Sequence, residues 1–213
     1  MPNWVFNELT CTFNTDEEYN AFKEKANTES LFDSFLPMPL ILEGTLSPHH
    51  NPNDFIAKVN QTKGTKFITL EGISLAGDEW DAQRARELMQ NLKAFEETGY
   101  YNWYDWHINN WGVKWDAKDC KSKELSDFNT IIFYFDTPWD SPNNFGVELS
   151  KLYPDATFEL VAGSIESDFH YEYTFKNGTI EYPLSYETFK DAVLDGKWGG
   201  PENWSCLFED EEV

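Results

Sequence analysis

Two short motifs in the sequence place a carboxylate two residues before an imidazole, a pairing that general acid–base catalysis uses. They are Asp105-x-His107 and Asp168-x-His170, and in each the carboxylate could orient the histidine as a base. Neither motif comes with a serine or cysteine in a recognisable nucleophile motif, and chance pairs of this kind are common in so acidic a chain. We therefore assign no catalytic residue and expect a binding protein, not an enzyme.

The sequence also offers half of a metal site, in which His49 and His50 are followed by Asp54. Adjacent histidines point to opposite sides of a strand, and no further histidine or cysteine lies at ligand spacing. GxGxxG, Walker and HExxH motifs are absent from the sequence. The glycine-rich residues 196–201 follow a predicted helix instead of opening one, which is typical of a loop. We expect no metal and no cofactor.

Net charge limits the class of partner. The 213 residues include 38 acidic and 16 basic ones, which gives a formal charge of −22. Contact with phosphates needs clustered lysine and arginine, so the charge predicts no direct binding to nucleic acid and none to an anionic membrane surface. A solubilising surface and a partner with a basic groove both remain open as explanations.

Cysteine usage and hydropathy bear on the compartment. The three cysteines, Cys11, Cys120 and Cys206, lie far apart without a CxxC pair, which favours a reducing environment. The N-terminus lacks the pattern of a signal peptide, and no apolar stretch approaches the roughly 20 residues of a membrane span. We expect a soluble protein of the host cytoplasm, and its oligomeric state stays open.

Acidic residues recur in clusters along the chain. The clustered residues are Asp16, Glu17, Glu18, Asp78, Glu79, Asp81, Glu96, Glu97, Glu209, Asp210, Glu211 and Glu212. B-DNA carries one negative charge per roughly 1.7 Å of helix axis, and carboxylates at a similar density could occupy a DNA-binding groove. A merely solvated acidic face is the alternative interpretation.

Hydrophobic periodicity predicts the elements that must position these residues. Strands are expected at residues 4–13, 66–70, 128–137, 157–162, 169–175 and 179–182, and helices at 15–28, 79–98, 144–153 and 186–194. Residues 100–115 are rich in aromatics, and their first half could form a further helix. The apolar run in 128–137 predicts a central strand buried on both faces, and Asn177-Gly178 predicts a hairpin turn.

This order of elements predicts an α+β fold, with an antiparallel sheet and helices on one face. We expect a ferredoxin-like (split βαβ) core with insertions. Residues 1–208 would form a single domain with an insertion at about 40–80, and residues 209–213 an acidic tail.

Three blocks of sequence follow one another in a recognisable order. They are Pro2-Asn3-Trp4 with Asn7 and Leu9, Trp111-Gly112-Val113-Lys114-Trp115-Asp116-Ala117, and Phe133-Tyr134-Phe135-Asp136-Thr137-Pro138-Trp139 with Ser141-Pro142. In these blocks the chain resembles the phage- and plasmid-encoded YubB ferredoxin-like family. The resemblance implies an origin in a mobile element and a ferredoxin-like core, and it supplies no established catalytic residues.

The middle block and Trp139 are candidate ligand-binding residues. The residues in question are Trp111, Gly112, Lys114, Trp115, Asp116 and Trp139. In one interpretation the indoles form a stacking platform with Lys114 and Asp116 as polar contacts. In the other, the indoles fill the core and Lys114 and Asp116 hold a tight turn.

Together these observations lead to a main hypothesis and an alternative. The main hypothesis is a mobile-element protein that binds and inhibits a host defence protein with a basic groove, of the restriction or CRISPR type, through an acidic DNA-like surface. The alternative is a domain that binds or sequesters a small ligand with the aromatic residues from Trp103 to Trp115.

Overall fold

The computed structural model describes residues 2–46, 68–69, 72–73, 79–204 and 207. The chain divides into two compact units. The first unit comprises Met1–Pro37 and Asn110–Val213, and the second comprises Met38–Asn109. The insertion predicted at about 40–80 falls within the second unit, which continues to Asn109 and so includes the long helix as well. The predicted acidic tail lies outside the described residues.

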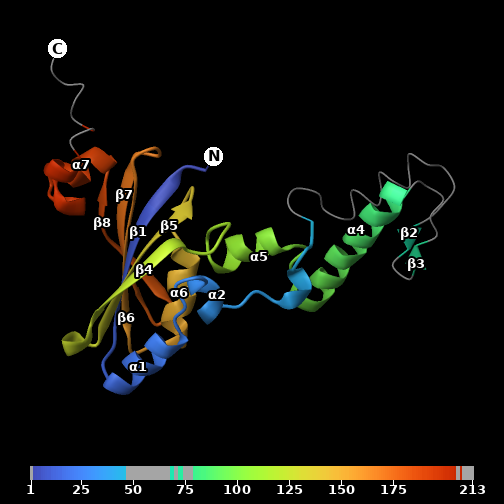
Figure 1. Cartoon of the computed structure of the whole chain (residues 1–213), viewed down its shortest axis with the longest axis horizontal. Helices are drawn as coiled ribbons and strands as arrows, with labels where there is room; N and C mark the ends of the chain where they lie inside the picture. Colours follow the sequence, from blue (N-terminus) through green and yellow to red (C-terminus); the bar gives the residue numbers. More distant parts are fainter. Residues whose placement is uncertain (1, 47–67, 70–71, 74–78, 205–206, 208–213) are drawn as a thin grey trace, which may run out of the picture. The chain divides into compact units, whose positions relative to one another are not determined.

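The first unit is built on a six-stranded antiparallel sheet, and this confirms the predicted α+β class with an antiparallel sheet (Figure 1). The strand order is β4-β5-β1-β6-β7-β8. The strands are β1 Trp4–Thr12, β4 Lys118–Leu125, β5 Thr130–Pro138, β6 Thr157–Ser164, β7 Phe169–Lys176 and β8 Thr179–Tyr186. The predicted Asn177-Gly178 turn joins β7 to β8, and both of its residues have positive φ, 46° and 75°, as a two-residue hairpin turn requires.

The first unit also contains helices, some between strands and some after the last one. They are α1 Asp16–Lys25, α2 Leu31–Phe35, α6 Asn143–Leu152 and α7 Phe189–Leu194, with short 3₁₀ turns η2 Ser126–Phe128, η3 Lys197–Gly199 and η4 Pro201–Asn203. Helix α1 begins where the sequence predicts. The Thr15 hydroxyl accepts from the Glu18 backbone N–H at 3.3 Å, and the acids of the first turn favour the positive end of the helix dipole.

An aromatic core lies between one face of the sheet and helices α1, α2 and α6. In β1 every second residue is buried, so Leu9 and Cys11 point toward these helices. Phe22 of α1 is fully buried and stacks on Phe35 of α2 with ring centres 4.5 Å apart. Gly146 lets α6 approach β7, because a Cβ at this position would lie 2.6 Å from the ring of Phe175.

The prediction that the helices lie on one face of the sheet is wrong for α7. Phe6 alternates with the core residues of β1 and therefore points to the other face, where it lies against Trp198 and Trp204. Its strand partner Gly163 faces the same way, and a Cβ there would lie 2.8 Å from Phe189 of α7. The C-terminal segment thus covers the β1–β6 part of the second face.

Two strand predictions also differ from the structure. Strand β5 is not buried on both faces, because Tyr134 in its middle is 38% exposed. Strand β4 was not predicted at all, since its sequence KDCKSKEL is polar and mostly exposed. It forms the edge of the sheet and pairs only with β5 among the described strands. The edge position explains why β4 needs no alternating apolar residues.

The second unit holds the longest helix of the chain. Its elements are η1 Leu40–Leu42, the two-stranded sheet of β2 Ile68–Thr69 and β3 Gly72–Ile73, α4 Glu79–Thr98, and α5 Trp103–Asn110, whose last residue belongs to the first unit. Helix α4 has the predicted bounds and ends at Gly99, whose φ is 79°. None of the helices in the described ranges is long and apolar enough to cross a membrane.

Candidate functional site

The first acid–imidazole pair does not form a catalytic dyad. Asp105 and His107 are two residues apart on α5, a spacing at which side chains do not face each other on a helix. The Asp105 carboxylate instead accepts from the side-chain amide of Asn102 at 2.8 Å. The His107 ring lies against Trp103 and Trp106. Asp105 therefore stabilises the start of α5.

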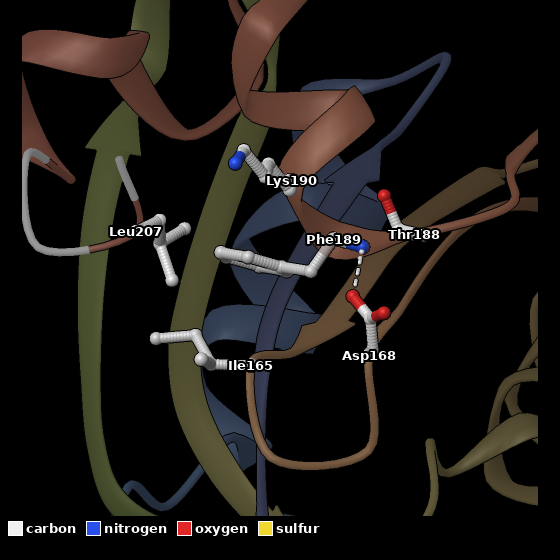
Figure 2. A pocket seen from close by; sticks show the side chains of 6 residues that line it. All are labelled: Ile165, Asp168, Thr188, Phe189, Lys190 and Leu207. Atoms are coloured by element: carbon white, nitrogen blue, oxygen red, sulfur yellow. Dashed lines mark hydrogen bonds between the residues drawn. The ribbon is translucent and has the colours of Figure 1, made fainter. Parts of the chain in front are cut away.

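The second pair, Asp168 and His170, does not form a dyad either, because the two side chains form hydrogen bonds with different partners. Figure 2 shows the Asp168 carboxylate directed at the start of α7, where it accepts from the backbone N–H of Phe189 at 3.0 Å. A shallow hollow surrounds this contact, and it is lined by Ile165, Asp168, Thr188, Phe189, Lys190 and Leu207. Asp168 thus satisfies the first backbone N–H of α7, whose N-cap is Thr188, and does not orient the imidazole of His170.

His170 belongs instead to a buried polar network on the face covered by α7. It is fully buried, and its Nδ1 accepts from the indole N–H of Trp198 at 3.0 Å. Since an indole can only donate, the proton of the ring lies on Nε2, which faces the Glu172 carboxylate at 3.3 Å. Lys197 pairs with the same carboxylate. The network attaches η3 to β7 and leaves His170 without an open side for a substrate.

This network makes stability depend on pH. Burial lowers the pKa of His170 below its usual 6.5, and the hydrogen bond to Glu172 acts in the opposite direction. A lowered histidine pKa means that the unfolded chain binds the proton first. The stabilisation is thus complete above pH 6.5 and is lost as the pH falls toward the folded pKa.

We therefore expect acidification from about pH 7.5 to about pH 5.5 to reduce the free energy of unfolding more in the unchanged chain than in His170→Gln. Glu172, Lys197, Trp198 and Tyr186 surround the imidazole. The pKa of Glu172 is lowered from its usual 4.5, so this group changes the stability only when the pH falls below about 4.5. Urea titrations at several pH values measure the difference, and equal slopes for the two proteins would contradict the expectation.

The two described thiols offer no nucleophile. Cys11 is fully buried, and burial raises its pKa well above the usual value. Burial, with a smaller contribution from Asp116, raises the pKa of Cys120 to about 12. Within the described ranges no three His, Cys, Asp or Glu side chains are grouped to hold a metal ion. His49, His50 and Asp54 lie outside those ranges.

The predicted acidic surface is divided between the two units. Asp16 and Glu17 are exposed at the start of α1 in the first unit, and Glu18 beside them is half-buried. Glu96 and Glu97 are exposed on α4 in the second unit. Glu79 and Asp81 lie on α4, at a part of the helix whose side chains are not described. Asp78 and the tail residues 209–212 lie outside the described residues.

The aromatic residues from Trp103 to Trp115 are divided in the same way. Trp103 and Trp106 belong to the second unit, whereas Trp111 and Trp115 belong to the first. Trp111 is buried and donates its indole N–H to the backbone oxygen of Leu36 at 3.1 Å. The block therefore does not form one site within either unit, and Trp111 fills the core as the structural interpretation proposed.

Gly112 and Asp116 hold the segment of residues 111–117 in place. Gly112 has a φ of 87°, and a Cβ there would lie 3.2 Å from the backbone nitrogen of Asn144 at the start of α6. The Asp116 carboxylate accepts three backbone N–H groups, those of Phe32 at 2.8 Å, Asp33 at 3.0 Å and Ala117 at 2.7 Å. Burial nonetheless raises the pKa of Asp116, and these hydrogen bonds act in the opposite direction.

Trp115 and Trp139 behave differently from Trp111, because both are open to solvent. Trp115 is 39% and Trp139 is 49% exposed, and their ring centres lie 5.8 Å apart. The Lys114 ammonium lies 4.6 Å from the centre of the Trp115 ring and 5.6 Å from that of Trp139. This is the distance range of a cation–π contact, and it combines a positive charge with two adjacent exposed indoles.

Trp4 and Lys118 extend this group along the sheet. The Trp4 ring lies 6.4 Å from that of Trp115, and the Lys118 ammonium lies 4.3 Å from the centre of the Trp4 ring. We call Trp4, Lys114, Trp115, Lys118 and Trp139 the tryptophan–lysine surface. Three indoles and two ammonium groups from β1, β4 and two loops thus gather in the first unit.

Trp139 has a backbone conformation that a tryptophan rarely adopts. Its φ is 66°, in the left-handed region that costs a non-glycine residue roughly 1–2 kcal/mol. The conformation is held by the bond from its backbone N–H to the Asn3 carbonyl at 2.8 Å. Strain at an exposed aromatic residue is typical of a site that serves binding at the expense of stability.

Sequence reasoning missed Trp4 and Lys118 as members of this surface. Strand pairing brings them there, since Trp4 is opposite Pro138 in the register of β1 with β5 and Lys118 is opposite Asp136 in that of β4 with β5. One sequence feature could have pointed to Trp4 as a member of this surface. Trp4, Trp115 and Trp139 each lie in one of the three sequence blocks that carry the family resemblance.

No protein-family model matches the sequence, and a search of the curated proteins finds no match either. Among solved structures, the chain is similar to the crystal structure of protein api92 from Yersinia pseudotuberculosis, of family DUF1281. The identity is 11% and the TM-score 0.46, over 88% of this chain and 98% of that one. A similarity at this level supports no inference about function.

Proposed function

We propose that this chain is a binding protein, not an enzyme, and that its ligand carries a planar aromatic group and a negative charge. The observation that carries the proposal is the exposed pair Trp115 and Trp139 with the Lys114 ammonium over both rings. Stacking of an aromatic group on such rings contributes roughly 1–3 kcal/mol. The ammonium groups of Lys114 and Lys118 would attract the negative charge.

The site is preformed, which favours binding. Trp115 lies between the core residue Val113, which is 1% exposed, and the buried end of the block at Ala117. Asp116 fixes the intervening backbone through its three hydrogen bonds. A ligand would therefore not have to order this segment, and the affinity would not be reduced by that entropy.

The test uses an aromatic anion and its uncharged counterpart. Calorimetric titration with naphthalene-2-sulfonate is expected to give binding, and 2-naphthol to bind at least about 10-fold more weakly, because a charge contact of about 1.4 kcal/mol is lost. Trp139→Gly is expected to abolish most of the binding. It should change the free energy of unfolding only slightly, since glycine adopts positive φ without strain and this gain offsets the lost ring contacts with Trp115 and Lys114.

Phe128→Ala is the matched control, because Phe128 is a 73% exposed ring in η2, outside the tryptophan–lysine surface. Its affinity for naphthalene-2-sulfonate should equal that of the unchanged chain. Equal loss in both variants, or no binding of naphthalene-2-sulfonate at all, would refute the proposed function.

A second candidate function is inhibition of a host defence protein with a basic groove, of the restriction or CRISPR type, by an acidic DNA-like surface. It is favoured by the net charge of −22 and by the exposed Asp16 and Glu17 at the start of α1. Carboxylates that meet lysine and arginine across an interface accelerate association, and salt screens this attraction.

For this candidate we expect capture of a single nucleic-acid-binding protein from host lysate at about 50 mM salt, with release at about 200 mM salt or by added DNA. Asp16→Asn with Glu17→Gln should weaken the capture, and Glu202→Gln, an exposed acid of η4, serves as control. Capture that salt does not change would exclude the DNA-like mode.

We also propose that β1, α1, β4, β5, α6 and β6 form a ferredoxin-like core, and that the chain is a cytoplasmic protein of the YubB family from a mobile element. The strand order β4-β5-β1-β6 supports the first part. Helix α1 lies between β1 and β4 in the chain, and α6 between β5 and β6, as in two split β-α-β crossovers. Strands β7 and β8 would then extend that core.

A further inference from the structure

The edge strand β4 carries three lysines that face the same side of the sheet. Lys121 is opposite Tyr134 and Lys123 is opposite Ile132, two positions further along β5. Lys118 and Lys121 are three residues apart and would face opposite sides of a regular strand. The register shifts between them, and Asp119 in the bulge has a φ of 52°. The bulge therefore brings Lys118 into line with the other two.

The opposite side of β4 faces the helices, which fixes the direction of the lysines. Glu124 is opposite the buried Ile131, and its carboxylate accepts from Tyr19 and Lys23 of α1 at 3.2 Å and 3.1 Å. Lys121 and Lys123 alternate with Ser122 and Glu124 and so point away from α1. They lie on the sheet face that α7 does not cover at β4 and β5.

This row joins the tryptophan–lysine surface, since Lys118 belongs to both. The 38% exposed Tyr134 lies opposite Lys121 on the same face. Successive lysines on one side of a strand are separated by roughly 6.6–6.8 Å. The face thus presents a row of positive charges, with Tyr134 opposite Lys121 and the indole of Trp4 beside Lys118.

This face gathers a quarter of the basic residues of the chain. It carries Lys114, Lys118, Lys121 and Lys123 of the 16 basic residues, and the carboxylates of Glu8, Asp119 and Asp136 lie among them. Glu29 also lies beside Lys118 and Lys121, and the exposed Asp140 follows Trp139 directly. A row of ammonium groups in so acidic a chain suits a ligand with several negative charges.

We propose that this face binds nucleotides, with the base stacked on the exposed rings and the phosphate held by the β4 lysines. The inference rests on the proposed function, because it identifies the aromatic anion for which the tryptophan–lysine surface is suited. Aromatic rings beside a basic track are the arrangement by which proteins hold single-stranded nucleic acid without reading its sequence. It is also the opposite of what the net charge alone predicts.

The acidic remainder of the chain limits the length of the ligand. At physiological salt, charges further apart than about 8 Å are screened, so a short strand senses mainly the lysines of this face. A long strand would extend over carboxylates and gain nothing from its additional phosphates. Duplex DNA keeps its bases stacked inside and would not reach the indoles.

The test follows quenching of tryptophan fluorescence in the full chain. The probes are adenosine 5′-monophosphate, hexathymidylate, a 12-base-pair duplex and hexaglutamate. Hexathymidylate is expected to quench and to bind at least about 10-fold more tightly than the duplex or hexaglutamate, since neither of these offers unstacked bases. If adenosine 5′-monophosphate binds as tightly as hexathymidylate, the natural ligand is a free nucleotide. If it binds more weakly, the natural ligand is a single strand.

Lys121→Glu with Lys123→Glu is expected to weaken hexathymidylate at least 10-fold and to lower the slope of log affinity against log salt by about 1.4, for two lost phosphate contacts. Lys25→Glu with Lys176→Glu makes the same charge change at exposed positions of α1 and β7, and should leave both quantities almost unchanged.

Two outcomes separate this inference from the proposed function. If naphthalene-2-sulfonate binds and neither nucleotide probe does, the nucleotide inference is wrong and the proposed function stands. If none of these probes binds, both are wrong. Hexaglutamate binding as tightly as hexathymidylate would overturn the inference too, because the surface would then recognise charge without bases.

Discussion

Replacing Phe22 by alanine is expected to lower the free energy of unfolding of the first unit by about 3–5 kcal/mol. The side chain is fully buried and stacks on Phe35 at 4.5 Å. It also contacts Phe13, which follows β1, at 4.7 Å and Tyr153 at 5.2 Å between ring centres. Its removal leaves a cavity at the point where α1 and α2 meet the sheet, and rigid neighbouring rings cannot close it.

Urea denaturation followed by circular dichroism measures this loss. Phe128→Ala removes the same side chain from a position that is 73% exposed, so its effect should stay within about 0.5 kcal/mol of zero. A loss below about 1 kcal/mol for Phe22→Ala would mean that the aromatic core repacks, contrary to the tight packing of native interiors.

The second large effect is expected for Asp116→Ala, at about 2–3 kcal/mol. The carboxylate accepts the backbone N–H groups of Phe32, Asp33 and Ala117. Hydrogen bonds to a charged acceptor contribute about 1.5–3 kcal/mol, and donors left buried without an acceptor add to the loss. Because Asp116 follows Trp115 directly, the variant should also weaken binding of naphthalene-2-sulfonate.

Asp116→Asn keeps one acceptor oxygen and should lose less stability than the alanine variant. Asp127→Ala removes the same charge from an exposed residue of η2 and should be close to neutral. The same urea titrations decide the matter. If Asp116→Ala and Asp127→Ala lowered the free energy of unfolding equally, the Asp116 carboxylate would not hold α2 to the segment of residues 111–117.

Elements with strong local signals could be predicted from the sequence. Helix α4 was predicted with its final bounds because its apolar residues recur at helical spacing and Gly99 follows it. The Asn177-Gly178 turn was predicted because few other residue pairs adopt two consecutive positive φ angles. Strand β4 was missed because an exposed edge strand needs no apolar residues to bury, and KDCKSKEL contains almost none.

The candidate site could be predicted only in part, for a different reason. Trp115 and Trp139 were identified from the sequence, but whether each was core or surface depended on backbone geometry. Trp111 and Trp115 are four residues apart, and only Trp111 points into the core. Strand pairing brings Trp4 and the β4 lysines to the site. Trp4 pairs with Pro138, which lies more than 100 positions away in the sequence. No local sequence pattern indicates that these two residues are neighbours.

The bulged, lysine-bearing edge of the sheet has a consequence for aggregation. An exposed edge strand presents unpaired backbone groups to which another chain can add a strand, and lysines and bulges on the edge oppose this. Strand β4 has both, with Lys118, Lys121 and Lys123 around the bulge. Replacing these lysines by valine would thus promote fibril growth by strand addition, whereas replacement by glutamate keeps the edge charged and the chain dispersed.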